Sequence, residues 1–376
     1  MKILVDIRHL TNPQPSGVGG YTKALLDAIF HLDQKNEYVL FASGAPKTLR
    51  RLPKFDAPNV RLLTIPIPNK IINSSIALSG RPYLEDLLPK VNRPDAWFFP
   101  NLNYIATKLP YVVTAHDLSF RIFPEFFSAR MRLWHRLINP KRVFSRARAI
   151  LAPSNSTKQD LVELYGVNEK RIHVTPLGIS NALQSGTDQA MKVAKKFGRY
   201  VLSVATIEPR KNHLSLIEAY EMYRDRTGDE ITLVIAGATG WKAQPVLEAI
   251  KKSRYAHGIH LLDYVSEEQK IELYKRATLF VFPSFYEGFG LPVLDAMSHG
   301  LPIITSHTSS MPELVGDAGI LIDPFNVNDL FVAIREVMHS KTLQAELKTR
   351  GLKRAKDFSW NKTAKQTLDV FGELSF

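Results

Sequence analysis

Short apolar runs alternate with helical patterns along the whole of this 376-residue chain, and this alternation constrains the fold more than any other feature. Strands separated by helices favour βαβ units, in which the strands are parallel and the helices cover the sheet. The runs with strand character are 3–7, 38–41, 60–63, 96–99, 111–115, 149–152, 200–204, 231–236, 259–262, 279–282 and 301–305. They repeat in the same manner in both halves of the chain. We therefore expect an α/β protein with two similar domains.

The length and composition agree with this expectation. A chain of 376 residues is longer than a domain with one hydrophobic core usually is. Its content of 45% hydrophobic and 23% charged residues is typical of a soluble globular protein. No apolar run approaches the roughly 20 residues that a membrane helix needs, and the first strand, Met1–Asp6, is too short to be a signal peptide. We expect the domain boundary near Pro176–Ile179, with the polar stretch 180–186 as a hinge. Because the chain has no cysteine, disulfides and thiolate metal sites are excluded, which suits a cytoplasmic protein.

The net charge of +13 is concentrated in the first half of the chain. Residues 1–180 hold 25 Lys and Arg against 13 Asp and Glu, and residues 121–148 hold eight basic residues against Glu125 alone. Phe126, Phe127, Trp134, Leu137 and Phe144 are interleaved with these cations. Such a segment is compatible with an anionic membrane surface, and equally with a solvated basic face above a buried apolar side. No recognised motif supports a nucleic-acid partner.

The segment 284–297, Ser-Phe-Tyr-Glu-Gly-Phe-Gly-Leu-Pro-Val-Leu-Asp-Ala-Met, follows a buried strand and leads into a helix. Pro292 stands at a plausible first position of that helix. A strand–loop–helix unit of this kind presents backbone N–H groups and a positive helix end to an anion. Glu287 and Asp295 add acceptors that suit sugar hydroxyls, which together indicate a sugar nucleotide. The alternative is that they are a loop acid and a solvated helix acid.

The run 206–213, Thr-Ile-Glu-Pro-Arg-Lys-Asn-His, follows the strand 200–204 in the same way. Arg210 and Lys211 are adjacent cations at a strand end, where a guanidinium fork and an ammonium can grip a diphosphate. Negative charge grows on a leaving nucleoside diphosphate, so cations here lower the barrier to its departure. The chain has no Asp-x-Asp motif between strands and no group of His or Cys residues at the spacing of metal ligands. The sequence therefore gives no indication of a metal site.

The segment 284–297 resembles the Glu-x7-Glu signature of retaining glycosyltransferases of the GT-B fold, family 4 in particular, with Asp295 in place of the second Glu. The resemblance covers nearly the whole chain and is strongest in residues 150–325. It implies two Rossmann-like domains with parallel sheets facing across a cleft. Residues 1–178 form the acceptor domain and 179–359 the donor domain in this interpretation. The last helix, 360–376, crosses back to the first domain.

The resemblance also assigns roles to residues. Glu287 faces the donor sugar, Asp295 holds the ribose, and Arg210 with Lys211 stabilises the leaving diphosphate. His116, at the end of the strand 111–115, is a positioning group near the reacting centre. The resemblance makes residues 17–20 a flexible loop near the phosphates. The further substrate-binding candidates are Gly17, Gly19, Gly20, Gly288, Phe289, Gly290, Leu291 and Val265.

Together these features predict a metal-independent, retaining glycosyltransferase without a cofactor. Its first-choice donor is GDP-mannose, by resemblance to bacterial polysaccharide mannosyltransferases, with UDP-glucose or UDP-N-acetylglucosamine as alternatives. The acceptor is a glycan or lipid-linked glycan. The location is cytoplasmic, with peripheral contact at the inner face of the membrane through residues 121–148. A non-catalytic sugar-nucleotide sensor is the rival from another class. A retaining glycosidase is disfavoured because Glu287 and Asp295 are too far apart along the chain to share one scissile bond.

Overall fold

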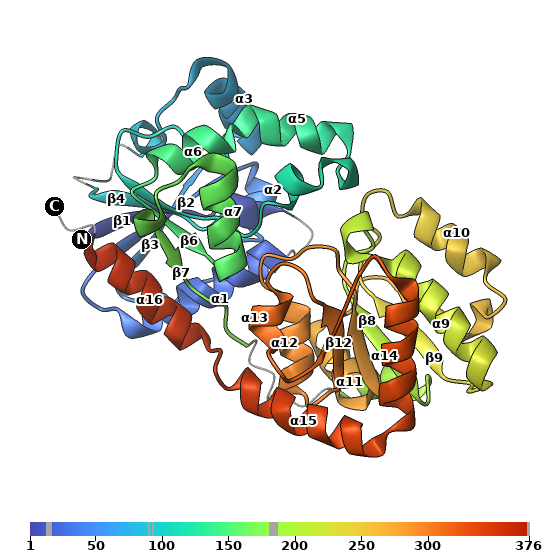
Figure 1. Cartoon of the computed structure of the whole chain (residues 1–376). Coiled ribbons are helices and arrows are strands. Elements are labelled where there is room, and N and C mark those ends of the chain that lie inside the picture. Colours follow the sequence, from blue (N-terminus) through green and yellow to red (C-terminus); the bar gives the residue numbers. More distant parts are fainter. Residues whose placement is uncertain (13–16, 89–90, 92–93, 180–186, 374–376) are drawn as a thin grey trace. The chain divides into compact units, whose positions relative to one another are not determined.

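A computed structural model describes residues 1–12, 17–88, 91, 94–179 and 187–373, so the expected hinge at 180–186 lies outside the described residues. The chain forms two compact units (Figure 1). The first unit comprises Met1–Leu118, Ala129–Gly178 and Ser359–Phe376, and the second comprises Ser119–Ser128 and Ile179–Phe358. Each unit is described below by itself.

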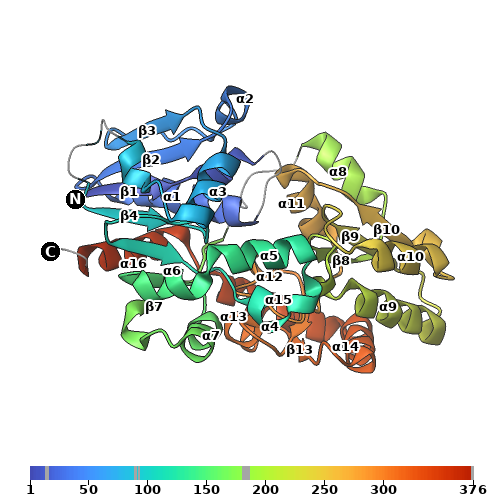
Figure 2. The ribbon, with the colours of Figure 1, turned by 90° about the horizontal axis from the view of Figure 1, so that it is seen from above.

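The first unit is built on a seven-stranded parallel sheet in the order β3-β2-β1-β4-β5-β6-β7. Figure 2 shows β3, β2, β1 and β4 following one another across the view. The strands are β1 Lys2–Asp6, β2 Glu37–Ser43, β3 Val60–Ile65, β4 Ala96–Phe99, β5 Tyr111–Thr114, β6 Ala149–Ala152 and β7 Ile172–Val174. The central strands are buried on both faces, as a sheet covered by helices requires. The strand order reverses between β1 and β4, which is where α/β folds bind ligands.

Helices cover this sheet on both faces. They are α1 Gly17–Leu32, α2 Pro46–Leu49, α3 Asn69–Ser79, α5 Ala129–Ile138, α6 Pro140–Arg146, α7 Asn155–Tyr165 and α16 Trp360–Glu373, with short 3-10 helices η1 Arg8–Thr11, η2 Leu84–Leu87 and η4 Glu169–Arg171. α16 packs along α1, and the ring of Phe371 lies 5.4 Å from that of Phe98. Gly178 meets the start of α16 so closely that an added Cβ atom would lie 2.1 Å from the backbone nitrogen of Trp360. The C-terminal helix therefore belongs to the first unit.

The second unit is built on a six-stranded parallel sheet in the order β10-β9-β8-β11-β12-β13. Its strands are β8 Tyr200–Val204, β9 Thr232–Ala236, β10 Ile259–Leu262, β11 Leu279–Phe282, β12 Ile303–Ser306 and β13 Ile320–Ile322. Its helices are α4 Ser119–Ile122, α8 Asp188–Lys195, α9 His213–Thr227, α10 Gln244–Lys252, α11 Glu267–Arg276, α12 Leu291–Ser298, α13 Met311–Val315, α14 Val327–His339 and α15 Lys341–Ala355, with η3 Pro124–Phe126, η5 Pro209–Lys211 and η6 Ala256–Gly258. The strand order reverses between β8 and β11. The α/β architecture with two parallel sheets predicted from the sequence is confirmed.

Residues 119–128 belong to the second unit, although the sequence analysis assigned them to the first domain. The indole nitrogen of Trp241 donates a hydrogen bond of 2.8 Å to the carbonyl of Phe126, and the Trp241 ring stacks 5.9 Å from that of Phe127. Phe126 also stacks on Phe285 at 5.4 Å. Packing between aromatic residues that are distant in sequence thus places this segment in the second unit. The basic stretch 121–148 is therefore divided between the two units: its beginning belongs to the second unit and its remainder to the first.

Candidate active site

The candidate site of the second unit lies where β8 and β11 pair, with Leu279 opposite Val201. This pairing is the point at which the strand order reverses. The short helix η5 follows β8, and the loop containing Glu287 follows β11. The backbone N–H of Phe285 donates to the carbonyl of Arg210 at 2.9 Å, and the Ser284 hydroxyl donates to the same carbonyl at 3.0 Å. These bonds join the two predicted motifs at the ligand-binding edge of the sheet.

Glu287 receives both predicted cations. Nη1 of Arg210 donates to Oε2 of Glu287 at 2.8 Å, and Nζ of Lys211 donates to Oε1 at 2.5 Å. The Ser284 hydroxyl adds a third hydrogen bond of 2.6 Å to Oε1. All three charged side chains are shielded from water, with Glu287 only 7% exposed. The structure thus brings Arg210, Lys211 and Glu287 into one ion cluster.

The electrostatics of this cluster keep the Glu287 carboxylate charged. Burial by itself would raise its pKa, but the charges of Arg210 and Lys211, aided by hydrogen bonds from Lys211 and Ser284, outweigh burial and lower the pKa of Glu287 to about 2. An ionised acid at this position accepts hydrogen bonds and cannot donate a proton. Glu287 is therefore suited to orienting hydroxyl groups and holding the cations, and unsuited to general acid catalysis near neutral pH.

Glu208 is a member of the cluster that the sequence analysis did not assign. Its Oε1 lies 2.8 Å from Nη2 and 3.1 Å from Nε of Arg210. Glu208 is buried, and burial raises its pKa in spite of the neighbouring Arg210. The Arg210 guanidinium is consequently held by two carboxylates and by the Tyr286 carbonyl at 2.9 Å. The only sequence signal was that Glu208 lies two positions before Arg210 in the same loop.

The loop from Gly288 to Leu291 leads directly into α12 and leaves the helix start without a side-chain cap. Gly290, the residue before the helix, has φ of 107°, and an added Cβ atom would lie 2.4 Å from Cε of Met311. Only glycine meets both conditions. The Phe289 ring packs against Phe358 at 5.7 Å, so this residue offers a ligand its backbone and not its ring. An uncapped helix start beside two cations is a suitable environment for phosphate oxygens.

Asp295 lies farther along α12, is buried, and has Nζ of Lys270 3.7 Å from its Oδ2. Lys270 belongs to α11, and its second carboxylate partner is Glu267 at 2.7 Å. The sequence analysis did not identify Lys270, because nothing in the chain indicates that α11 lies against α12 here. Val265 lies in the loop between β10 and α11 and is half-buried. Val265 thus lies just before α11, and Asp295 is paired with Lys270 near the start of the same helix.

His116 belongs to the first unit and follows β5. Its Nε2–H donates to the carbonyl of Pro100 at 2.8 Å, and the Tyr21 ring lies edge-on at 4.6 Å. Burial lowers the pKa of His116. The neutral ring protonated at Nε2 leaves Nδ1 as an acceptor. This arrangement suits a positioning group that accepts a hydrogen bond, which is the role expected from the sequence.

The glycine-rich segment of the first unit does not form the expected loop. Gly17, Gly19 and Gly20 form the first turn of α1, and none of them has a positive φ. Gly17 and Gly20 are exposed, and an added Cβ atom would meet nothing within 4 Å at either position. The prediction of a flexible loop at 17–20 is therefore wrong. Consecutive glycines permit a loop, but they also permit a helix, and here they take part in the helical hydrogen bonding of α1.

His9 lies beside this turn and was not assigned from the sequence. Its Nε2 is hydrogen-bonded to Oγ1 of Thr22 at 2.8 Å, and Oγ1 of Thr22 also lies 2.9 Å from the carbonyl oxygen of Val18. Burial, partly offset by Asp6, lowers the pKa of His9 to about 4. His9 and His116 both follow strands of the first sheet, β1 and β5. Only the position of His9 just after the first strand could have indicated it.

Within the part of the chain that the structure describes, no group of three or more His, Cys, Asp or Glu side chains has a geometry for holding a metal ion. In the same residues, no helix is both long and apolar enough to cross a membrane.

Comparison with known proteins identifies the class. The family model described as glycosyl transferases group 1 matches residues 187–354, and the model described as glycosyltransferase family 4 matches residues 18–182. Among solved structures, sucrose-phosphate synthase from Thermosynechococcus elongatus has a TM-score of 0.76 at 16% identity over 99% of this chain and 98% of that one. Anabaena HepE in complex with UDP-glucose has a TM-score of 0.73 at 19% identity over 99% and 100% of the two chains. These neighbours assign the fold to that of GT-B glycosyltransferases.

Sequence relatives are more specific. O-antigen chain mannosyltransferase B of Escherichia coli is 32% identical over 279 residues, which are 72% of this chain and 72% of that protein. Serotype-specific mannosyltransferase WbdA of Escherichia coli is 29% identical over 279 residues, which are 70% of this chain but only 33% of WbdA. The chain belongs to glycosyltransferase family 4, and the family resemblance predicted from residues 284–297 is confirmed.

Proposed function

We propose that this glycosyltransferase moves mannose from GDP-mannose to a hydroxyl group of a growing glycan, with retention of anomeric configuration. Support for mannose comes from the names of the relatives, which include an O-antigen chain mannosyltransferase at 32% identity. In this proposal the second unit binds the donor and the first unit binds the acceptor. The lipid-linked form of the glycan is the acceptor that a basic protein surface favours.

The observation that carries the proposal is the buried cluster of Arg210, Lys211 and Glu287 beside the uncapped start of α12. A nucleoside diphosphate gains negative charge as its bond to the sugar breaks. A guanidinium and an ammonium already fixed by Glu287 can stabilise that charge without reorganising during the reaction. Glu287 serves this function by holding both cations, and its remaining lone pairs can orient sugar hydroxyls.

The state of the acids in the second unit supports retention with the leaving group as the base. Glu287 is held ionised by its two cations, and its carboxylate is engaged by three donors. Such a carboxylate is a weak base. The acceptor proton therefore passes to the phosphate oxygen that leaves, on the face from which the sugar departs. His116, neutral and protonated at Nε2, positions hydroxyl groups through Nδ1.

Peripheral contact with the inner face of a membrane is part of the proposal, and α5 carries it. Leu133, Trp134 and Leu137 are exposed apolar residues of this helix, at 55%, 37% and 49%. Basic residues of the same helix are exposed beside them. Phe127 and Phe144, counted from the sequence as part of the surface, are buried instead. The membrane-facing surface is thus smaller than the stretch 121–148.

A thermal-shift panel tests the donor. GDP, UDP, ADP and their mannose and glucose conjugates are added at equal concentration, since a bound ligand raises the unfolding temperature with its occupancy. GDP and GDP-mannose should give the largest shifts, and the product of a transfer assay with GDP-mannose should show the α-anomeric NMR signal of retention. A shift with UDP and none with GDP rejects the donor assignment. Donor binding without transfer to any acceptor glycan would identify a sensor.

A further inference from the structure

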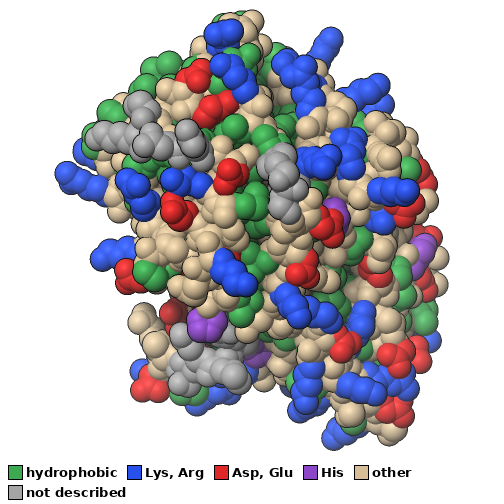
Figure 3. All heavy atoms as spheres, turned by 90° about the vertical axis from the view of Figure 1, so that its left-hand side faces the viewer, with side chains coloured by type: hydrophobic (Ala, Val, Ile, Leu, Met, Phe, Trp, Pro, Cys, Tyr) green, Lys and Arg blue, Asp and Glu red, His purple; other side chains and the backbone are tan. Residues whose placement is uncertain are grey.

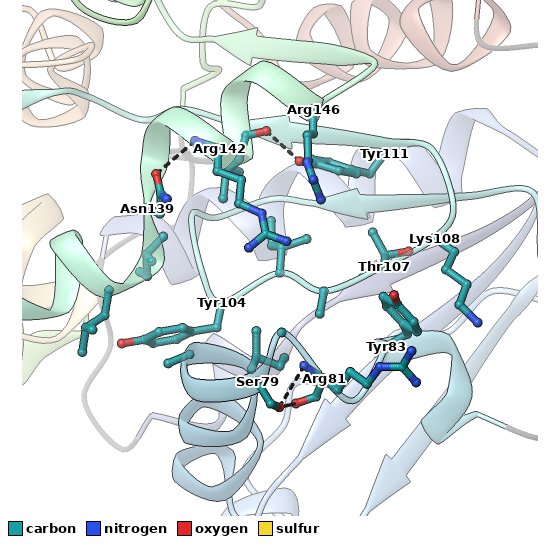
Figure 4. Close-up of a pocket in the computed structure, with 18 of the residues that line it drawn as sticks. Ser79, Arg81, Tyr83, Tyr104, Thr107, Lys108, Tyr111, Asn139, Arg142 and Arg146 are labelled. Carbon is teal, nitrogen blue, oxygen red and sulfur yellow. Dashed lines mark hydrogen bonds between the residues drawn. The ribbon is translucent and has the colours of Figure 1, made fainter.

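A large polar pocket in the first unit lies apart from the residues assigned to sugar transfer, and it shares Leu133 and Leu137 with the exposed face of α5. It has a volume of about 720 Å³ and is enclosed by the end of α3, the turn at 79–83, the segment 104–108, the end of α5 and α6. Figure 4 shows the residues that line it. Neither His116 nor the glycine turn of α1 is among them. The function derived so far leaves this pocket without a ligand.

The lining of the pocket is strongly basic. Its charged members are Arg81, Lys108, Arg136, Arg142 and Arg146, with no Asp or Glu among the lining residues. Among the described residues, no ion pair within 4.0 Å joins any of these five side chains to a carboxylate. In Figure 4, Arg142 and Arg146 extend from α6 over the cavity, and Arg81 and Lys108 flank Tyr83 on another side. Like charges gathered without counterions repel one another, so an anion bound among them would be favoured.

Neighbouring groups contact two of these cations and the helix that carries two others. The Tyr111 hydroxyl donates to the carbonyl of Val143 at 2.6 Å, which anchors α6 at the pocket wall. Lys108 and Arg81 lie 4.6 Å and 5.1 Å from the centre of the Tyr83 ring. The nearby Glu85 carboxylate accepts the backbone N–H of Lys108 at 2.7 Å and does not neutralise the pocket by an ion pair. Arg81 and Lys108 are therefore stacked on Tyr83, and Arg142 and Arg146 project from a helix that is anchored at the pocket wall.

The rim of the pocket is apolar and exposed. Leu133 and Leu137 line the pocket although they are 55% and 49% exposed. On the other side, α3 carries Leu78, which is 89% exposed and lies between the lining residues Ala77 and Ser79. α3 and α5 lie side by side in Figures 1 and 2, and both contribute to the pocket. Large apolar side chains exposed together around a group of cations complement a ligand with an anionic head and apolar chains.

We propose that this pocket binds the phosphate group of an anionic membrane lipid, with the lipid's acyl chains against the apolar rim. The guanidinium groups of Arg142 and Arg146 supply forked donors to phosphate oxygens. Basic side chains elsewhere are spread over the surface with acidic ones among them, as Figure 3 shows for one face. The pocket differs because five basic residues and no acidic residue line a single cavity. It would hold the first unit at a membrane through a specific headgroup and not only through surface charge.

This inference rests on the membrane contact proposed for α5 but not on the donor sugar, and its test measures binding of soluble probes without membranes or turnover. Calorimetry uses three soluble probes with the full chain: dihexanoyl phosphatidic acid below its critical micelle concentration, dihexanoyl phosphatidylcholine, and glycerol 3-phosphate. The first has anionic phosphate and chains, the second lacks net charge, and the third lacks chains. Phosphatidic acid should bind at least tenfold more tightly than either of the others.

Matched variants locate the site. The pocket pair Arg142→Gln with Arg146→Gln should weaken phosphatidic acid at least tenfold. The control pair Lys54→Gln with Arg61→Gln removes the same charge from exposed residues of the first unit outside the pocket lining and outside α5, and should stay within twofold of the unchanged protein. Leu133→Ser should weaken phosphatidic acid but not glycerol 3-phosphate. Circular dichroism and the unfolding temperature establish that each variant is folded.

Three outcomes would overturn the proposal. Equal weakening by both arginine-containing pairs would show attraction by overall charge and no specific pocket. Equal affinity for phosphatidylcholine and phosphatidic acid would show that the phosphate charge is not recognised. Glycerol 3-phosphate binding as tightly as the lipid would identify a soluble phosphate ester as the ligand. None of these results would bear on sugar transfer, which is measured separately.

Discussion

The replacement Glu287→Gln tests the ion cluster in a quantitative way. Gln has the size of Glu but carries no charge, so Arg210 and Lys211 lose their shared carboxylate while the loop keeps its packing. The pKa of Glu287 is lowered from 4.5 to about 2. Each pKa unit is worth about 1.4 kcal/mol, so the charged form contributes about 3 kcal/mol to the free energy of unfolding at pH 7. We expect the variant to be less stable by about that amount, within the range for breaking a buried ion pair.

The sign of the pH dependence follows from the direction of the shift. A carboxyl group whose pKa is lower in the folded state contributes its stability above pH 4.5 and loses it as the pH falls through 2. The difference in the free energy of unfolding between the two proteins should therefore decrease from about 3 kcal/mol at pH 7 to about 1 kcal/mol at pH 3. Urea denaturation read by hydrogen exchange of the β11 and α9 amides reports the second unit separately from the first.

The control for this experiment is Glu248→Gln, because Glu248 is an exposed acid of α10 whose partner Lys252 lies 3.9 Å away. It should change stability by no more than about 0.5 kcal/mol. The reasoning is refuted if Glu287→Gln is as stable as the unchanged protein at pH 7. It is also refuted if the difference between them stays constant from pH 7 to pH 3.

Other predictions concern single contacts. Asp295→Asn should weaken GDP binding about 10- to 100-fold, because a hydrogen bond to a charged group is worth about 1.5–3 kcal/mol; calorimetry checks this, with Glu267→Gln, the exposed partner of Lys270, as the control expected to bind normally. Trp241→Phe removes the indole hydrogen bond to the Phe126 carbonyl, so limited trypsin cleavage at Arg121 should be about fivefold faster, for a loss of about 1 kcal/mol; unchanged cleavage would contradict the packing of residues 119–128 described above. His213 is buried, its ring nitrogens have no hydrogen-bond partner among the described residues, and burial lowers its pKa to about 3. Because the unfolded chain then binds the proton more readily, the free energy of unfolding of the unchanged protein should fall by about 2 kcal/mol more than that of His213→Leu between pH 7 and pH 5. An equal change in the free energy of unfolding of the two proteins over this range would disprove the prediction.

The sequence predicted the architecture well because apolar strands and the amphipathic helices between them are local patterns. β7 and β13 were missed because each has only three residues, too few to show a pattern. The cluster at Arg210 and Glu287 was also predictable, since each motif directly follows a strand and neighbouring parallel strands end at the same sheet edge.

What the sequence did not show depends on contacts between distant residues. Trp241 and Phe126 are 115 positions apart, and their hydrogen bond moves residues 119–128 into the second unit. Lys270 approaches Asp295 only because α11 and α12 are neighbours in the fold. The conformation of residues 17–20 was open for another reason: glycine permits both loop and helix, so its presence alone does not distinguish them.

The central claim is that Arg210 and Lys211 stabilise the departing nucleoside diphosphate more than the bound donor. The most direct test is the single-turnover transfer rate of Arg210→Gln at saturating GDP-mannose, compared with the Kd of the same sample for the donor. The control is Arg199→Gln, whose side chain is 60% exposed. We expect the rate to fall about 100-fold or more while the Kd changes far less. Equal losses in rate and in affinity, or no loss in rate, would contradict the claim.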